Sequence, residues 1–576
     1  MAPFCSYSPR IGGRGVNLQD FARRAANVRG MTVAEQPPAA PSVGGTTDIS
    51  RFFTNSDRSV YALKNLPEEV VAYLFARYSR SRLSLREDLR NMIEAEGLGA
   101  LIESRGAGAR GDPGAAFAQI QDRARTFAER YVLGYGHSSV AEHGVVHLAL
   151  EDVSILASKL VEDARLASYT EKSTRYVAFD PGKVYYPPAV LADPRLADDY
   201  RETIRALLGA YVNWNEDFVA QIKARTPRGE KQTERAYEAA SRATAFDLLR
   251  YLLPTATHTN VGLTLNARTL EHLITKLLSQ PLEEGQALGR RIQEEAQHIV
   301  PTLLKYAGHN AYRAETGEAI AALAREVLGE VPPAPNNGGA GEGAINRAPT
   351  GVSFPAPPLL GAGGASVSLL FSDPDADERL VAAILYGASS LPMAALLARV
   401  KTMSRDTKER VVDEYLTRRG RHDAPGRALE RLSCTVEMTM DYGAYRDIQR
   451  HRMATQATQA LTPALGYETP ADYETFGYRG QYEELMARAA WTYARLQNAG
   501  LAHEAAYALP LASRIRVLFT WNLREVTHFV ELRSARQGHP SYRKVAQDVY
   551  HAVAAAHPLV ARYMRPNLKT YALTRE

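Results

Sequence analysis

The sequence predicts an α+β fold made of two mainly helical halves with a small sheet in each. In several segments apolar residues recur at spacings of three and four, as on the buried face of a helix. Shorter runs of alternating apolar and polar residues, at 145–149 and 433–440, favour a strand in each half. An internal repeat relates the halves, and such a repeat decides the architecture of a chain.

The helical pattern is sustained over segments in both halves. They are residues 117–131, 201–225, 233–253, 269–278, 283–306, 480–499 and 542–563. Two stretches lack it. Residues 1–48 mix Pro, Gly, Ser and Arg and are expected to form a disordered leader. Residues 331–366 are rich in Pro, Gly and Ala and are expected to form a linker. The predicted domains are therefore 49–330 and 367–576.

Length and composition indicate a globular protein of more than one domain. The chain has 576 residues, too many for a single core, and 45% of them are hydrophobic and 23% charged. Its formal charge of +5 is compatible with anionic small substrates such as nucleotide phosphates. No run of Lys and Arg is dense enough to suggest a nucleic-acid partner.

Cysteine content and hydropathy restrict the location of the protein. The two cysteines, Cys5 and Cys434, exclude a disulfide framework and a cysteine-rich zinc site and favour a reducing compartment. No apolar stretch approaches the roughly 20 residues that span a bilayer, and the N-terminus lacks the apolar core of a secretory signal. We therefore expect a cytoplasmic protein with no membrane partner.

The repeat is gapless between LPTATHTNVGLTLNARTLEH, which starts at Leu253, and LPLASRIRVLFTWNLREVTH, which starts at Leu509. The separation is 256 residues throughout (509 − 253). The matched pairs are Leu253/Leu509, Pro254/Pro510, Thr264/Thr520, Asn266/Asn522, Arg268/Arg524 and His272/His528. Asn and His are neutral to poor helix formers, so their repetition indicates either helix caps or a shared site.

A first candidate site is GHSSVAEH, which starts at Gly136 and contains His137, Ser139, Glu142 and His143. Hydroxyl, carboxylate and imidazole groups lie close together there and could grip sugar or phosphate hydroxyls. A metal interpretation rests on His143 and His147, four residues apart, but lacks a third ligand, so we expect no metal. The structural alternative is a helix start capped by Ser139.

Two further segments carry groups suited to a nucleotide. In SYTEKSTRY, side chains 171, 173 and 175 alternate, so an extended or turn segment would aim Glu171, Ser173 and Arg175 the same way, towards a phosphate and sugar. The structural alternative is a polar edge of the fold that is exposed to solvent, which would have the same sequence. Arg450-His451-Arg452 forms a dense positive patch for anionic rings and phosphates, with a surface cluster or a nucleic-acid contact as alternatives.

Together these islands resemble the flavin-dependent thymidylate synthase family, whose pattern is HxSxxEH, RHRxxSxNExSxRY, ARxxLP and NxRxxxHxxxxR. The order is kept over residues 73–306 and again, in part, over 382–563. The resemblance implies two tandem copies of that family's fold. It also implies reductive methylation of deoxyuridylate (dUMP) to thymidylate with FAD, methylenetetrahydrofolate as carbon donor and NADPH as reductant. The flavin would carry the redox chemistry, so no side-chain nucleophile is needed.

Each half keeps motif residues that the other has lost. The first half keeps the opening motif HxSxxEH and also Glu171, Ser173, Arg175 and Arg250. It has lost other motif residues: Asp163-Ala164-Arg165 aligns with RHR, Thr170 with the Asn and Leu277 with the final Arg. The second half keeps Arg450-His451-Arg452, Asn522, Arg524, His528 and Arg533. At the positions of Glu171, Ser173, Arg175 and Arg250 it has Thr458, Ala460, Thr462 and Ala506, and it keeps only Glu430 of the opening island.

Because the family builds its sites between subunits of a homotetramer, the resemblance implies a composite site between the halves and a homodimer that mimics the tetramer. The other interface would be a structural copy without activity. The expected substrate-binding residues are Glu171, Ser173, Arg175, Arg250 and Arg533, and the expected catalytic residues are Arg450, Arg452 and Arg533. The expected flavin-binding residues are His137, Ser139, Glu142, Asn266, Arg268, His272, Arg450, His451, Arg452, Asn522, Arg524 and His528. The alternatives are a non-catalytic flavin- or nucleotide-binding protein and a flavoenzyme for another uracil-containing substrate.

Overall fold

A computed structural model describes residues 48–79, 81–95, 138–328 and 366–571. The predicted leader and the predicted linker lie outside these residues except for the last residue of each, residues 48 and 366. The predicted helix at 117–131 and His137 also lie outside them. The chain divides into two compact units, of which one comprises residues 1–65 and 81–120. Its described elements are η2 (Ser50–Phe52) and α3 (Leu85–Ala95), and the guanidinium of Arg86 lies 3.7 Å from the ring centroid of Tyr61. The other unit, residues 66–80 and 121–576, contains both repeats and is treated from here on.

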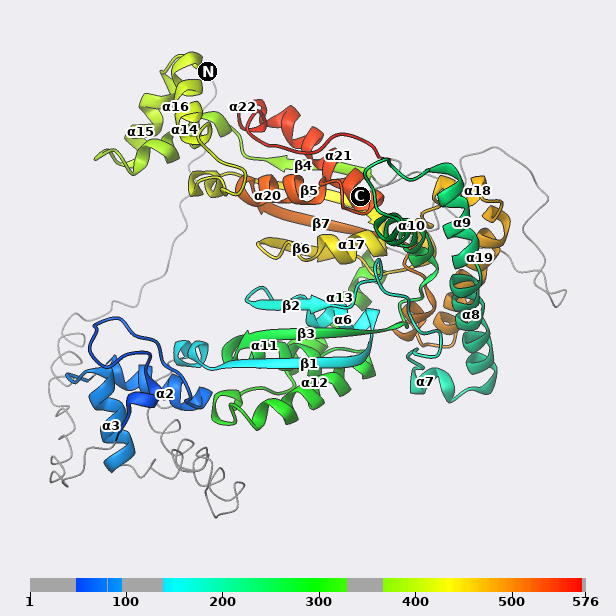
Figure 1. The fold of residues 1–576 in the computed structure, drawn as a ribbon, viewed down its shortest axis with the longest axis horizontal. Coiled ribbons are helices and arrows are strands. Elements are labelled where there is room, and N and C mark those ends of the chain that lie inside the picture. Colours follow the sequence, from blue (N-terminus) through cyan, green and yellow to red (C-terminus); the bar gives the residue numbers. More distant parts are fainter. Residues whose placement is uncertain (1–47, 80, 96–137, 329–365, 572–576) are drawn as a thin grey trace, which may run out of the picture. The chain divides into compact units, whose positions relative to one another are not determined.

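Each repeat contains an antiparallel sheet (Figure 1). The first sheet has the order β1-β3-β2, with β1 at Val145–Ser154, β3 at His258–Asn266 and β2 at Ala167–Glu171. The second has the order β4-β5-β7-β6, with β4 at Ser366–Ser372, β5 at Ser433–Asp441, β7 at Arg514–Asn522 and β6 at Ala454–Thr458. Strands β5, β7 and β6 repeat the order of β1, β3 and β2, so the α+β prediction is confirmed.

Helices surround both sheets. In the first half they are α2 (Glu68–Tyr78), η4 (Ser138–His143), α6 (Ile155–Val161), α7 (Pro188–Leu191), α8 (Pro194–Asn213), α9 (Asn215–Arg225), α10 (Glu234–Leu249), η5 (Arg250–Leu252), α11 (Ala267–Leu278), α12 (Glu283–Gln297), η6 (Thr302–Leu304) and α13 (Ala311–Leu328). In the second half they are α14 (Ala376–Tyr386), α15 (Met393–Lys401), α16 (Arg405–Leu416), η7 (Arg427–Arg431), α17 (Tyr442–Ile448), η8 (Pro463–Leu465), α18 (Ala471–Thr475), α19 (Arg479–Asn498), η9 (Glu504–Ala508), α20 (Leu523–Arg533), α21 (Pro540–Ala556) and α22 (Pro558–Ala561). Within the described ranges, no helix combines the length and the apolar character needed to cross a membrane.

Several predicted helices are shorter than their sequence pattern. The segment 201–225 is divided between α8 and α9 at Trp214, and 233–253 is helical only to Leu249 before η5 begins. The segment 542–563 is interrupted at His557 because Pro558 disfavours a helical conformation in the residue before it. Apolar periodicity therefore located these helices but not their ends.

Polar caps determine where each strand passes into its helix. The side chain of Ser154 accepts from the N–H of Ala157 at the start of α6, and that of Asp441 accepts from Ala444 at the start of α17. At the ends of β3 and β7, Asn266 and Asn522 cap α11 and α20 in the same way. Their side chains thereby satisfy N–H groups that have no partner within the helix. The repeated Asn thus has a structural role in both halves.

The two halves meet about a local twofold arrangement. Pro254 pairs with Pro510, its own equivalent in the repeat, in an antiparallel bridge. The N–H of Thr255 donates to the carbonyl of Leu509 at 2.9 Å, and the N–H of Leu511 donates to the carbonyl of Leu253 at 2.9 Å. Contact between equivalent residues is the mark of an isologous, dimer-like interface, here enclosed in one chain.

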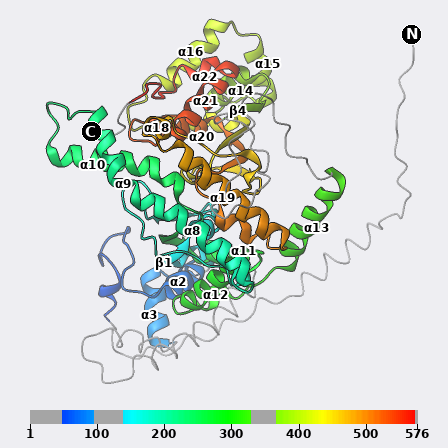
Figure 2. The same ribbon diagram turned by 90° about the vertical axis from the view of Figure 1, so that its right-hand side faces the viewer.

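Helices α8 and α19 pack side by side across the same interface (Figure 2). The hydroxyls of Thr203 and Thr492 are 2.7 Å apart, and both residues are fully buried. One apolar core draws residues from both halves, and a second lies between the first sheet and helices α11 and α12. The two halves therefore share a core rather than folding as independent domains.

We expect Thr492→Val to lower the free energy of unfolding by about 1 kcal/mol, because it removes the buried hydrogen bond between the two hydroxyls and leaves Thr203 with only the 3.3 Å contact from Nε of Arg488. Urea titration followed by circular dichroism measures the change. An unaltered midpoint would mean that the hydroxyl pair contributes nothing to the interface.

Candidate functional site

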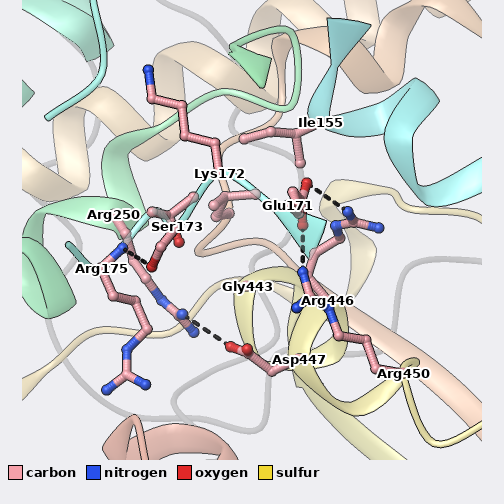
Figure 3. A pocket seen from close by; sticks show the side chains of 12 residues that line it. Ile155, Glu171, Lys172, Ser173, Arg175, Arg250, Gly443, Arg446, Asp447 and Arg450 are labelled. Carbon is pink, nitrogen blue, oxygen red and sulfur yellow. Dashed lines mark hydrogen bonds and ion pairs between the residues drawn. The ribbon is translucent and has the colours of Figure 1, made fainter. Parts of the chain in front are cut away.

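A pocket lies where the end of β2 in the first half meets α17 in the second (Figure 3). Its cavity volume is about 80 Å³. We call it the arginine pocket, and its polar lining comprises Glu171, Lys172, Ser173, Thr174, Arg175, Arg250, Arg446, Asp447 and Arg450. Four guanidiniums from two distant parts of the sequence therefore share one cavity.

Arg175 is held rigidly on one side of the pocket. Its Nε and Nη2 donate to the two carboxylate oxygens of Asp247 at 2.6 and 2.9 Å, and its Nη1 donates to the hydroxyl of Tyr542 at 3.1 Å. Such a two-pronged ion pair fixes the plane of the guanidinium. The chain turns after Glu171, so the three alternating side chains reach one cavity through a turn that follows the strand.

Arg250 is the most deeply buried cation of the pocket, with 1% of its surface exposed. Its Nη1 donates to Asp447 at 3.2 Å, and its Nη2 lies 3.9 Å from Asp441. Nε and Nη2 have no hydrogen-bond partner among the described residues. Gly443 makes room for this side chain, since a Cβ there would lie 3.1 Å from Nη2. Two nitrogens of this guanidinium are thus buried without a hydrogen-bond partner in the part of the chain that the structure describes, which is costly.

The opposite wall of the pocket is a network that links α17 to the first half. Arg446 donates to Glu171 at 2.8 Å and to Glu162 at 3.1 Å, and Arg450 donates to Glu171 at 2.8 Å. Burial raises the pKa of Glu162, although the nearby guanidinium of Arg446 opposes the shift. The Nη1 of Arg446 is a further buried donor with no hydrogen-bond partner in the described part of the chain. Motif analysis missed Arg446, which lies in α17, whereas Arg450 lies in the turn that follows the helix.

Asp447 stands among these arginines. Burial acts to raise the pKa of its carboxyl, but the guanidiniums of Arg250, Arg533, Arg175 and Arg450 outweigh it and hold the pKa below the usual value. The carboxylate therefore stays ionised and stabilises the positive charge gathered around it. Sequence reasoning did not single out this residue either.

His451 does not line the pocket but connects two side chains of α20. Its Nδ1 lies 2.9 Å from a carboxylate oxygen of Glu525, and its Nε2 accepts from the Nε of Arg533 at 2.9 Å. Burial lowers the pKa of His451 to about 4, so the ring is neutral at physiological pH. Arg533 and Arg175 both lie over the ring of Tyr542, with guanidinium-to-centroid distances of 5.5 and 5.6 Å. Arg533 is thus a neighbour of the pocket cations.

Arg452 lies outside the pocket lining. It donates to the backbone carbonyls of Ala164, Arg165 and Ala167 and stacks over the ring of Tyr169. These contacts attach the edge of the second sheet to β2 of the first. The geometry gives this predicted catalytic residue a role in joining the halves.

The other predicted flavin residues are also outside the pocket. Glu142 forms an ion pair with Arg268, and Glu430 with Arg524 at 3.0 Å, so equivalent positions of the two halves carry the same pair. Ser139, His272 and His528 are exposed. His147, considered as a metal ligand, lies 2.8 Å from the hydroxyl of Thr264, and the described residues form no group of three His, Cys, Asp or Glu side chains suited to a metal.

In the other half, the position equivalent to the arginine pocket lacks all four arginines. The α6 segment corresponds to α17 at a separation of 287 residues (450 − 163), so Ser154 replaces Asp441, and Ala506 replaces Arg250. There the hydroxyls of Ser154 and Tyr507 both donate to Glu284 at 2.6 Å. All three residues are buried, with exposures of 0, 1 and 5% for Ser154, Tyr507 and Glu284. The equivalent position has Thr462, Ala506, Lys159 and Asp163 in place of Arg175, Arg250, Arg446 and Arg450. We call it the arginine-free counterpart.

Comparison with known proteins gives a consistent relationship over the whole repeat. Residues 100–302 and 368–559 each match the family model described as thymidylate synthase complementing protein. A UPF0159 protein of Chlamydia muridarum is 33% identical over 539 residues, which cover 90% of this chain and 93% of the relative. A UPF0159 protein of Chlamydia pneumoniae is 32% identical, with the same shares covered. A flavin-dependent thymidylate synthase of Thermococcus kodakarensis is 29% identical over 147 residues, or 25% of this chain and 50% of that protein.

The low pKa of His451 predicts a pH dependence of stability. The unfolded chain binds a proton on this residue near its usual pKa of 6.5, whereas the folded chain does so only near 4. Stability is therefore complete above about pH 6.5 and falls on acidification towards pH 4, by up to about 3 kcal/mol. His451→Gln should remove this part of the dependence. Urea titrations of both proteins between pH 4 and 8 test it, and parallel curves would contradict it.

Proposed function

This chain belongs to the thymidylate synthase complementing protein family, and from that membership and its arginine pocket we propose that it is a flavoenzyme that methylates deoxyuridylate. The substrate would lie in the arginine pocket, between the two halves. The observation that carries the proposal is the buried guanidinium of Arg250, which keeps two donors unused in a cavity lined by three more arginines. Such a cluster suits a phosphate, because guanidinium groups pair with it through two parallel hydrogen bonds.

The phosphate would accept hydrogen bonds from the guanidinium nitrogens that are not hydrogen-bonded to a carboxylate of the described residues. These are Nε and Nη2 of Arg250 and Nη1 of Arg446, together with the hydroxyl of Ser173 at the mouth of the pocket. Arg175 is engaged with Asp247 and would orient the ligand from the side. Arg533, next to Arg175 over Tyr542, would stabilise negative charge that develops on the uracil ring.

The residues that the family resemblance assigns to the flavin form a donor set that fits a dinucleotide. The guanidiniums of Arg268 and Arg524 are 43 and 37% exposed, and each is paired with one carboxylate, so each has donors left for a diphosphate. Bound FAD would supply the hydride and electron chemistry of the methylation. In this proposal NADPH and methylenetetrahydrofolate are co-substrates, and two chains assemble as a homodimer.

A non-catalytic nucleotide-binding protein is the second candidate, and Asp447 is the observation that favours it. A carboxylate inside a phosphate pocket repels the ligand that the arginines attract. Conversion of deoxyuridylate to thymidylate by the purified protein with FAD, NADPH and methylenetetrahydrofolate, followed by chromatography, separates the two functions. Binding without turnover would leave the second candidate.

We expect Arg175→Ala and Arg450→Ala each to weaken deoxyuridylate binding at least about 100-fold, because each removes a charged wall of the pocket, one from each half. The measurement is the shift of the flavin absorption band when deoxyuridylate is titrated into the FAD-loaded protein. Arg516→Ala, an exposed arginine of β7 that pairs with Glu437, is the matched control and should bind as before. If both pocket variants bind like the control, the composite site is wrong.

We also expect one deoxyuridylate per chain. The arginine-free counterpart has Thr462 and Ala506 in place of Arg175 and Arg250, so it lacks the guanidiniums that would bind the phosphate. Isothermal titration calorimetry gives the stoichiometry. A value of two would mean that the arginine-free counterpart also binds the ligand.

A further inference from the structure

Glu525, His451 and Arg533 are connected in that order by two side-chain hydrogen bonds. Arginine can only donate, so the Nε2 of His451 must be the acceptor of their 2.9 Å hydrogen bond. The imidazole proton then resides on Nδ1, which donates to the carboxylate of Glu525 at 2.9 Å. Glu525 thus selects the one neutral tautomer of His451 that can hold Arg533.

Helix α20 presents both ends of this chain. Glu525 lies in its first turn, where its N–H is bound by the capping side chain of Asn522, and Arg533 is its last residue. The His451 ring stands between them, perpendicular to Phe529, with ring centroids 5.0 Å apart and an interplanar angle of 87°. His451 is 3% exposed, so water does not replace either partner easily.

The repeat supplies an independent observation. At the positions equivalent to His451, Glu525 and Arg533, the first half has Ala164, Thr269 and Leu277. His451, Glu525 and Arg533 thus all lack counterparts at the position where the pocket arginines are also missing. Asn522, in contrast, is kept as Asn266, because the cap is needed in both halves. A carboxylate with only a local structural role on α20 would have no reason to disappear along with the other two.

We infer that Glu525 is a positioning residue of the nucleotide site, which through His451 fixes the guanidinium of Arg533 beside Arg175 and Asp447. The inference rests on the proposed function in that it assigns Arg533 to the ligand. Without Glu525, the proton of His451 has no buried acceptor and can move to Nε2. An Nε2–H cannot accept from Arg533, so the guanidinium would be released from its place over Tyr542.

The test compares Glu525→Gln with Glu525→Thr, the residue that the first half has at this position. The Gln carbonyl can still accept from Nδ1–H, whereas the shorter Thr cannot reach it. Nitrogen-15 NMR of the imidazole groups, with the His451 signals assigned by their loss in His451→Gln, reports the tautomer. We expect the Nδ1–H form in the wild-type and Gln proteins and a mixture or the Nε2–H form in the Thr protein.

Deoxyuridylate affinity is the second readout. Glu525→Thr should weaken binding about tenfold, Glu525→Gln should largely restore it, and Glu437→Thr, on the exposed side of β5, should leave it unchanged. Equal affinity of the Thr and wild-type proteins, or an unchanged tautomer in the Thr protein, overturns the inference. If the wild-type protein binds no deoxyuridylate, the proposed function fails, and the NMR signals still decide whether Glu525 controls His451.

Discussion

The structure depends on the pairing of the two Leu-Pro segments, in which Pro254 meets Pro510. Because equivalent residues contact each other there, the halves are related as the subunits of a dimer. Helix α17 of the second half then faces the end of β2 of the first half in the arginine pocket. Neither half can form the arginine pocket alone, and the interface necessarily creates two equivalent positions.

Fusion in one chain allows these two positions to differ, which identical subunits cannot do. One position keeps Arg175, Arg250, Arg446 and Arg450. The other has Thr462, Ala506, Lys159 and Asp163 at these positions. Burying arginines costs desolvation energy that ion pairs only partly repay. Where no ligand repays that cost, replacement of the arginines stabilises the interface, and this accounts for the complementary loss of motif residues.

The sequence could predict the parts of the site that carry local signals. Glu171, Ser173, Arg175, Arg250 and Arg450 stand in motifs with fixed spacing, and all of them line one pocket. The carboxylates Asp247, Asp447 and Glu162 were not predictable, because they pair with arginines that are 72, 197 and 284 residues away in the sequence. Glu525 was hidden for a similar reason, since its partner His451 belongs to another motif. Strands β1 and β5 were predicted from alternation, but β2, β3, β4, β6 and β7 were not. The helix ends depended on proline and tertiary packing.

The charge balance of the arginine pocket explains how it can exist without a ligand and still select one. Each guanidinium has a carboxylate partner: Asp247 for Arg175, Asp447 for Arg250, and Glu171 for Arg446 and Arg450. The net charge is therefore small, and long-range attraction alone would not retain an anion. What remains unsatisfied is a set of fixed donors, two on Arg250 and one on Arg446. Selectivity must then come from the geometry of these donors, and this is why the chain that orients Arg533 through His451 matters as much as the number of arginines.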